Sequence, residues 1–386
     1  MNNILNTSIV YTGVNDKTID LFEGQYMVPN GVSYNSYVIL DDKITVLDTV
    51  DARASEEWFA NLESALGSRK PDYLVVSHLE PDHSANIRRF MEKYPNTYIV
   101  SNAKTFAFLP QFFENMDIEG KTIVVKEGDV LQTGRHSLKF FMAPMVHWPE
   151  VMMTYDETDK VLFSADAFGK FGALDADEDW VCEARRYYFN IVGKYGVQVQ
   201  AVLKKLGTLE VQTICPLHGP VLSDNLEYYI GKYQLWSSYE PEDKGVLIAY
   251  ASMHGNTAKA ARKMKEFLEE KGIKTAITDL ARDDMAQAVG NAFRYDRLIL
   301  ASPTYDAGIM TYMESFLYSL KHKNYQKRTV ALIENGTWAP LAAKKMKEAL
   351  EGMKDIEVLE RVVTIRTEIK EKNLEEMREL AKELEE

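Results

Sequence analysis

Residues 78–83 read His-Leu-Glu-Pro-Asp-His, and this stretch decides how the first half of the chain is interpreted. It follows the apolar run Tyr73–Val76, which has the composition of a strand, and it precedes a helical pattern. A loop after a strand is where a rigid scaffold presents functional groups. A helix cap at Asp82 or Ser84 would explain one residue and leave the others without a role. The potential metal ligands of this loop are His78, Glu80, Asp82 and His83.

Three more potential ligands follow other predicted strands: His147, Asp166 and His218. Because the chain has only 7 histidines, four of them beside carboxylates at strand ends favour a metal site. Four imidazoles and three carboxylates exceed the three or four ligands that one zinc ion needs, so a pair of ions bridged by a carboxylate fits better. This donor set suits iron, manganese or zinc.

Strand and helix patterns predict an α/β protein with two domains. The first half mixes strand-like runs such as Ser33–Leu40 with helical patterns at 84–93 and 184–206, which predicts stacked sheets with helices outside. The polar stretch 237–245 contains Pro241 and Gly245 and is expected to be a linker, giving domains at 1–240 and 246–386. The second half predicts a doubly wound parallel sheet. Its expected strands are Val246–Tyr250, Lys274–Thr278, Arg297–Ala301, Thr329–Ile333 and Glu357–Val363, alternating with helices at Thr257–Glu270, Asp283–Ala292, Thr311–Ser319, Pro340–Glu351 and Leu374–Glu385.

Three loops of the second half fall at the edge where such a sheet binds ligands. The loop 252–257 opens a helix with hydroxyl and backbone donors, which suits one phosphate group. It has neither the lysine of a nucleotide-binding P-loop nor the three glycines of a dinucleotide site. Tyr305 and Trp338, in the loops 302–308 and 335–340, could flank a planar ring. An ordinary N-capped helix is the plainer alternative for the first loop.

Composition excludes several partners. The formal net charge of −13 argues against nucleic acid and against an anionic membrane surface. No apolar run approaches the roughly 18 residues of a membrane span, and no export signal is recognisable, so a cytoplasmic location is expected. Two cysteines can form at most one disulfide, which is too few to stabilise a chain of 386 residues. This low cysteine content favours a reducing compartment.

The His-x-Glu-x-Asp-His loop, followed by a flavodoxin-like second half, resembles the flavodiiron proteins. That resemblance implies a metallo-β-lactamase-like αββα sandwich fused to a flavodoxin-like domain. It also implies two non-haem iron ions, one bound by His78, Glu80 and His147, the other by Asp82, His83 and His218, with Asp166 as a bridge. FMN is the implied flavin. Its implied binding residues are Ser252, Met253, His254, Gly255, Asn256, Thr257, Pro303, Thr304, Tyr305, Asp306, Ala307, Gly308, Asn335, Gly336, Thr337 and Trp338.

The resemblance further implies reduction of dioxygen to water, of nitric oxide to nitrous oxide, or of both. Electrons would come from a separate carrier, expected to be rubredoxin, because the chain has no Cys-x-x-Cys pair. A basic patch for that carrier is expected among Lys321, Lys323, Lys327 and Arg328, and a head-to-tail homodimer is implied. Two alternatives are a zinc hydrolase with a flavodoxin-like appendage, for which Glu80 would usually be histidine, and a non-catalytic electron carrier.

Overall fold

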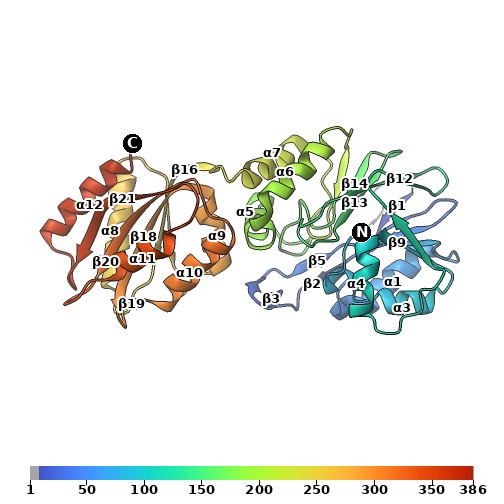
Figure 1. Cartoon of the computed structure of the whole chain (residues 1–386), viewed down its shortest axis with the longest axis horizontal. Helices are drawn as coiled ribbons and strands as arrows, with labels where there is room; N and C mark the ends of the chain where they lie inside the picture. Colours follow the sequence, from blue (N-terminus) through green and yellow to red (C-terminus); the bar gives the residue numbers. More distant parts are fainter. Residues whose placement is uncertain (1–7, 386) are drawn as a thin grey trace. The chain divides into compact units, whose positions relative to one another are not determined.

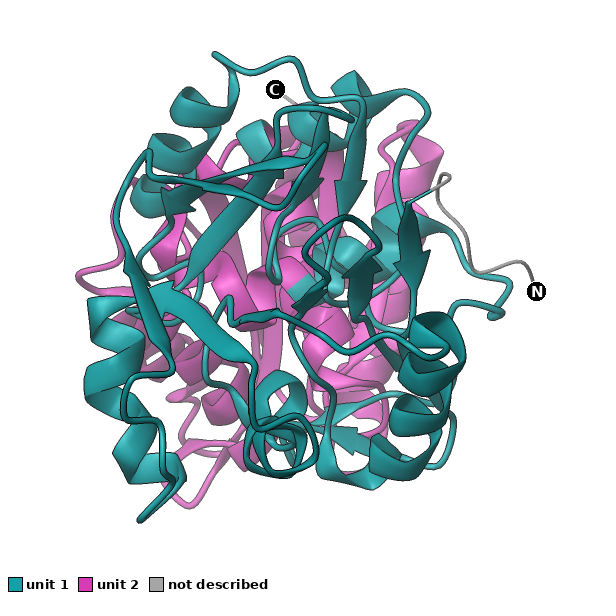
Figure 2. Cartoon of the chain, turned by 90° about the vertical axis from the view of Figure 1, so that its right-hand side faces the viewer, with its two compact units in different colours: residues 1–187, 197–234 teal, residues 188–196, 235–386 magenta. Residues whose placement is uncertain are grey.

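The computed structural model describes residues 8–385, and its chain divides into two compact units (Figure 2). The first unit holds the described chain up to Tyr187 together with Val197–Gln234. The second unit holds Tyr188–Gly196 together with the chain from Leu235 onward. Within the described residues, no helix is both long enough and apolar enough to cross a membrane.

The first unit is built on two β-sheets. One has the strand order β1-β6-β7-β8-β9-β10, in which β6 and β7 form the expected hairpin and β7 to β10 run parallel. The other has the order β11-β12-β13-β14-β15. The bounds are β1 Ile9–Tyr11, β6 Tyr37–Ile39, β7 Thr45–Leu47, β8 Tyr73–Val75, β9 Tyr98–Asn102, β10 Thr122–Val125, β11 Val130–Gln132, β12 Ser137–Met142, β13 Met152–Asp156, β14 Val161–Phe163 and β15 Thr213–Cys215.

One apolar core joins the two sheets. Leu47, Val75 and Val100 of the first sheet pack in the same buried cluster as Phe140 and Phe163 of the second. Burying each such side chain contributes roughly 1.5–3 kcal/mol, so the core holds the strand ends of both sheets in place. Helices lie outside these sheets (Figure 1). Their bounds are α1 Ser55–Leu66, α3 Ile87–Lys93, α4 Ala103–Phe112, α5 Trp180–Tyr187, α6 Gly196–Leu206 and α7 Leu226–Ser237.

Several predicted elements of the first half were wrong in detail. The run Ser33–Leu40 is not one strand, because β5 (Val32–Tyr34) pairs with β2 (Val14–Asp16) in a separate ladder. The predicted helix 84–93 is split into α2 (Pro81–Ser84) and α3. The predicted helix 184–206 is broken between α5 and α6 by a π-helical turn and a 3-10 turn. Helices α4 and α7 were missed.

The break in the long predicted helix has a packing cause. Phe189, in the π-helical turn, stacks on Phe293 with ring centroids 4.1 Å apart. The Tyr239 hydroxyl donates to the Gly193 carbonyl at 2.8 Å and accepts from the Gly196 N–H at 3.2 Å. These contacts lie within the second unit, so tertiary packing overrides the local helical preference here.

The second unit is a parallel sheet with the order β17-β16-β18-β20-β21, covered by helices (Figure 1). This confirms the doubly wound fold, and the five predicted strands and five predicted helices of this half all occur. The strands are β16 Asp243–Tyr250, β17 Thr275–Asp279, β18 Tyr295–Tyr305, β20 Arg328–Asn335 and β21 Ile356–Ile365, with β19 (Gly308–Ile309) paired to β18; the helices are α8 Asn256–Glu270, α9 Met285–Arg294, α10 Thr311–His322, α11 Ala342–Leu350 and α12 Glu371–Glu383.

One histidine of the first unit serves the fold. His136 is fully buried, and its Nδ1 lies 2.7 Å from Asp156 Oδ2. Burial lowers the pKa of His136, but the hydrogen bond and charge of Asp156 outweigh burial and raise that pKa above its ordinary value. Asp159 and Asp41 raise this pKa further, and Arg135 reaches the Nε2 side of the ring. The protonated form therefore stabilises the folded state, fully below the unfolded pKa of about 6.5.

We expect His136→Gln to lower the free energy of unfolding more at pH 6 than at pH 9, because the contribution is lost as pH rises through the raised folded pKa. Urea denaturation at the two pH values measures this. His322→Gln, at an exposed position in the last turn of α10, is the control and should change little at either pH. An equal loss for His136→Gln at both pH values would contradict the prediction.

Candidate functional site

Strand ends of the first unit bring all seven predicted ligands together. His78 and Glu80 follow β8, and Asp82 and His83 lie in the short helix α2, which Pro81 begins. The loops after β12, β14 and β15 supply the remaining three residues, which are His147, Asp166 and His218. We call His78, Glu80, His147 and Asp166 the first group, and Asp82, His83 and His218 the second group; the potential ligand atoms of each lie within 4.8 Å of one another.

The first group surrounds one point with two imidazoles and two carboxylates. His147 Nε2 lies 2.9 Å from Glu80 Oε2 and 3.1 Å from Asp166 Oδ2. His78 Nε2 lies 3.5 Å and 3.7 Å from the same two oxygens. Glu80, the residue that departs from the hydrolase pattern, thus occupies a potential ligand position beside His147.

The second group is joined to the first through Asp166. His218 Nε2 lies 3.2 Å from Asp82 Oδ2 and 2.9 Å from His83 Nε2. Asp166 directs Oδ1 toward His83 Nε2 at 3.6 Å, while its Oδ2 faces the first group. One carboxylate with an oxygen toward each group is the arrangement that a bridging ligand requires.

Buried polar atoms without partners show that a cation fits. Within the described residues, both ring nitrogens of His78, both carboxylate oxygens of Asp82 and Oδ1 of Asp166 are buried and form no hydrogen bond, although imidazoles and carboxylates lie within 3.2–3.7 Å of one another. Leaving such groups unpaired costs several kcal/mol each, and more for a carboxylate. Metal ions at the two groups would satisfy the atoms that face them, which for His78 is Nε2 alone, and the mixed nitrogen and oxygen donors suit iron, manganese or zinc.

The ionisation of these residues points the same way. Burial lowers the pKa of His78, but the charges of Asp166 and Glu80 outweigh it and raise that pKa to about 9. Burial and the charge of Glu80 raise the pKa of Asp82 to about 6. Burial also opposes ionisation of Asp166, yet the neighbouring imidazoles hold its pKa well below the ordinary value. Protons on imidazoles thus balance the carboxylates, and bound cations would replace those protons.

Neighbouring groups fix the orientation of the potential ligands. His218 Nδ1 lies 2.8 Å from the Ser33 carbonyl oxygen, an arrangement that leaves Nε2 for the site. The Tyr187 hydroxyl donates to Asp166 Oδ2 at 3.0 Å. The Leu79 N–H, between two ligands of the 78–83 loop, donates to buried Glu150 at 3.0 Å.

Sequence reasoning missed Tyr187 and Glu150. Tyr187 belongs to a helical pattern, in which an aromatic residue is interpreted as core. Glu150 lies only three residues after His147, but nothing in the local pattern shows that it is 2% exposed or that it accepts from another loop. Both contacts join residues that are distant in the chain, so only the fold reveals them.

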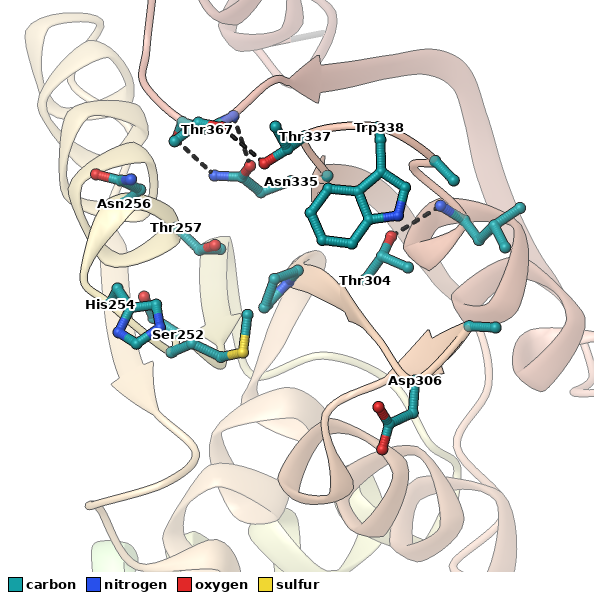
Figure 3. A pocket seen from close by; sticks show the side chains of 16 residues that line it. Ser252, His254, Asn256, Thr257, Thr304, Asp306, Asn335, Thr337, Trp338 and Thr367 are labelled. Carbon is teal, nitrogen blue, oxygen red and sulfur yellow. Dashed lines mark hydrogen bonds between the residues drawn. The ribbon is translucent and has the colours of Figure 1, made fainter.

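The second candidate site is a cavity of about 360 Å³ at the carboxyl ends of β16, β18 and β20 (Figure 3). Its first wall is the N-terminus of α8, where Ser252 Oγ accepts from the Gly255 N–H at 3.1 Å and the Ala258 N–H at 3.3 Å. Gly255 has φ +89°, a left-handed conformation that glycine adopts without strain. The first-turn N–H groups of α8 have no intrahelical acceptor, so they suit a phosphate.

Hydrogen bonds between loops hold the other walls of this cavity. Asn335 Nδ2 donates to the Thr367 carbonyl and Asn335 Oδ1 accepts from the Thr367 N–H, each at 3.0 Å. Thr304 Oγ1 accepts from the N–H groups of Leu341 at 2.8 Å and Ala342 at 3.1 Å. Figure 3 shows these side chains around the space that the α8 loop borders. The walls combine neutral hydroxyl, amide and backbone groups with apolar side chains such as Met253 and Leu341, and they include one acidic residue, Asp306, a chemistry that fits a flavin with one phosphate.

Most residues predicted for the flavin border this cavity. Gly255, Tyr305 and Gly308 do not line it, and Tyr305 is 47% exposed. Trp338 lines it and is 88% exposed, so its indole is free to cover a planar ring. Ala339, Leu341 and Thr367 line it as well, and Thr367 follows β21, a strand end that carried no ligand signal. The predicted residues that line it are Ser252, Met253, His254, Asn256, Thr257, Pro303, Thr304, Asp306, Ala307, Asn335, Gly336, Thr337 and Trp338.

Comparisons with known proteins agree with this geometry. Residues 32–219 match the ODP family beta lactamase and residues 247–379 match a flavodoxin domain. The chain is 30% identical to an anaerobic nitric oxide reductase flavorubredoxin of Vibrio vulnificus, over 86% of this chain and 69% of that protein. It is 30% identical to an uncharacterized protein of Methanocaldococcus jannaschii, over 98% and 97% of the two chains. The structure of a rubredoxin oxygen:oxidoreductase from Desulfovibrio gigas aligns with a TM-score of 0.92 at 26% identity, covering 99% of this chain and 97% of that one.

The Thr304 hydroxyl provides a test of the cavity wall. We expect Thr304→Val to lower the free energy of unfolding of the second unit by about 1 kcal/mol, because two N–H groups at the start of α11 lose their acceptor. FMN affinity should fall with it. Thr304→Ser keeps the hydroxyl and should restore both properties. Urea denaturation and flavin fluorescence titration measure the effects, and unchanged values for Thr304→Val would contradict the assignment.

Proposed function

The chain belongs to the flavodiiron proteins, and on that premise we propose that it reduces dioxygen to water, nitric oxide to nitrous oxide, or both. Each conversion consumes electrons and protons: four of each per dioxygen, and two of each per pair of nitric oxide molecules. The relatives support both substrates, since one is a nitric oxide reductase and another is a rubredoxin-oxygen oxidoreductase of Megalodesulfovibrio gigas, 29% identical over 86% of this chain.

The observation that carries the proposal is the position of Asp166. Its two oxygens face different groups of potential ligands, which supports a pair of ions in place of one. His78, Glu80 and His147 would hold one iron, and Asp82, His83 and His218 the other. Two irons so held would supply one-electron redox chemistry, and FMN in the second unit would supply electron storage.

The residues of this chain have defined tasks in that reaction. The Tyr187 hydroxyl donates to Asp166 and would hold it where its carboxylate could bridge two ions, and the Ser33 carbonyl would hold His218 with Nε2 facing the second group. Phe22 and Trp148 pack edge-on against His218 and His78, with ring centroids 5.3 and 6.3 Å apart, and keep bulk water from those imidazoles. In the second unit, the α8 loop would hold the FMN phosphate through neutral donors.

We propose that electrons come from a separate carrier, and rubredoxin is the proposed donor because a relative is named a rubredoxin-oxygen oxidoreductase. The expected basic patch needs correction. Arg328 is 2% exposed, and its guanidinium donates to carbonyl oxygens inside the second unit, so it stabilises the fold. Lys327 pairs with Glu240, and Lys323 donates to the Asn190 carbonyl. Lys321 and Lys327 are exposed, but Lys327 is engaged by Glu240, and Lys321 lies in a groove beside β19.

A zinc-dependent hydrolase with a flavodoxin-like appendage is the second candidate, because the first unit matches a β-lactamase family. Glu80 weighs against a zinc hydrolase, because a carboxylate in place of the usual histidine adds a negative charge to the ligand set of the first group. A complete flavin cavity in the same chain also has no task in hydrolysis.

We expect anaerobically purified protein to contain two irons and one FMN per chain. Once reduced, it should consume dioxygen or nitric oxide faster than free reduced FMN does. Elemental analysis, the flavin absorption spectrum and gas-electrode rates with each gas measure this. Asp166→Ala should lose iron and turnover but keep FMN, because its carboxylate belongs to the first unit only. Two zinc ions and no gas consumption would contradict the proposal and favour the hydrolase.

The active form is proposed to be a head-to-tail homodimer in which the flavin of one subunit serves the metal centre of its partner. Dilution below the dimer dissociation constant should then lower turnover per subunit while leaving flavin reduction unchanged. Mass photometry alongside stopped-flow kinetics measures both quantities. A strictly monomeric preparation with full turnover would contradict this arrangement.

A further inference from the structure

The loop that carries His218 is poor in backbone hydrogen-bond donors. It follows β15, and its residues 215–220 read Cys-Pro-Leu-His-Gly-Pro. Because proline has no N–H group, neither Pro216 nor Pro220 can donate a backbone hydrogen bond. Gly219 has φ +79°, a left-handed conformation that turns the chain sharply. The buried carbonyl oxygens of this loop therefore need donors from other segments of the first unit.

Asn35, in the segment between β5 and β6, supplies those donors. Its side-chain Nδ2 donates to the Pro216 carbonyl and to the Gly219 carbonyl, each at 2.8 Å. Its backbone N–H donates to the Leu217 carbonyl, also at 2.8 Å. One residue thus binds carbonyl oxygens on both sides of His218.

The partners of the Asn35 amide fix its orientation. Carbonyl oxygens only accept hydrogen bonds, so the amide nitrogen has to face the His218 loop. The amide oxygen, Oδ1, accepts from the Tyr11 hydroxyl at 3.0 Å on the other side. Asn35 is fully buried, where an unpaired amide would be destabilising, and here its nitrogen and its oxygen are both engaged.

The position of this loop determines where the His218 imidazole points. The Ser33 carbonyl accepts from His218 Nδ1 at 2.8 Å, and the Ser33 hydroxyl accepts from the Gly219 N–H at 2.7 Å. Nε2 of the same ring then lies 3.2 Å from Asp82 Oδ2 and 2.9 Å from His83 Nε2. His218 belongs to the second group, whereas the four members of the first group come from other loops.

We propose that Asn35 is a positioning residue for the metal ion that the second group would hold. This inference rests on the proposed diiron function and deepens it, because it assigns the support of one ion to one residue. The hydrogen bonds of Asn35 to the loop go to backbone carbonyls, so Asn35 acts through the placement of His218. Loss of the Asn35 amide should therefore weaken the second ion and spare the first.

The test uses Asn35→Leu in the full chain. Leucine is similar in size and cannot donate to the Pro216 and Gly219 carbonyls, so the His218 loop loses two of its bonds. The metal-free protein is titrated with ferrous iron alone, under argon, in a calorimeter. Affinity for one of two ions should fall roughly tenfold or more, while affinity for the other stays within about twofold.

Double variants show whether Asn35 acts through His218. If it does, the effects of the two residues on iron affinity are not additive. Adding Asn35→Leu to His218→Ala, which lacks the ligand itself, should change the remaining iron affinities by less than about twofold. Adding it to His147→Ala, which lacks a ligand of the first group, should still weaken the second ion roughly tenfold. A residue that only stabilised the fold would have the same effect in both backgrounds.

Asn373→Leu is the matched control, because Asn373 is also buried and donates its amide to a backbone carbonyl, that of Thr364, at 3.0 Å in the second unit. It should leave both iron affinities unchanged. Tyr11→Phe removes only the donor to Oδ1 and replaces Asn35→Leu if that variant does not fold. It should weaken the same ion about threefold, the effect of one hydrogen bond.

Two results would overturn the inference alone: equal affinities of wild type and variant for both ions, or equal weakening of both ions. Failure of the wild type to bind two ions would overturn the proposed function and the inference together.

Discussion

The buried carboxylate of Asp166 is the constraint on which the first unit depends. It is 1% exposed, and its oxygens face imidazoles on both sides. A carboxylate so far from water is tolerable only where opposite charge and hydrogen bonds surround it. The imidazoles arrive on loops from separate strands, so the shared core of the two sheets has to fix those strand ends before the carboxylate can be accommodated. The fold of the first unit and the geometry of its candidate metal centre therefore depend on each other.

The second unit meets a different requirement with the same kind of scaffold. Its cavity also lies where strands end, but its walls carry hydroxyls, amides and N–H groups in place of a charged cluster. Cross-links such as Asn335 to Thr367 and Thr304 to the start of α11 tie neighbouring loops together. Neutral donors on fixed loops can hold a phosphate and a ring without any buried charge, so this site has no need of metal to be stable when empty.

The residues that could be predicted from the sequence share one property. Glu80 and His147 lie in loops after apolar strands and Asn335 ends one, and polar groups in such places stand out against the pattern. The residues that were missed contact the sites through the fold. The helical pattern around Tyr187 predicts a core position, and Thr367 follows the last strand without a recognisable motif. The long predicted helix failed for the same reason, since the stacking of Phe189 on Phe293 has no local signature. Local sequence patterns are enough to predict the potential ligands, whereas the contacts that support them can be found only in the three-dimensional structure.

The charge of the ligand set connects the metal centre with its proposed chemistry. Negative groups around an ion lower the energy of its higher charge state more than that of its lower one, because the interaction grows with the charge of the ion. Replacing a neutral imidazole by Glu80 therefore favours ferric over ferrous iron and makes reduction of an oxidant easier. A zinc hydrolase gains nothing from this, since zinc does not change its charge state. A carboxylate at position 80 therefore suits a metal that gives up electrons better than it suits zinc.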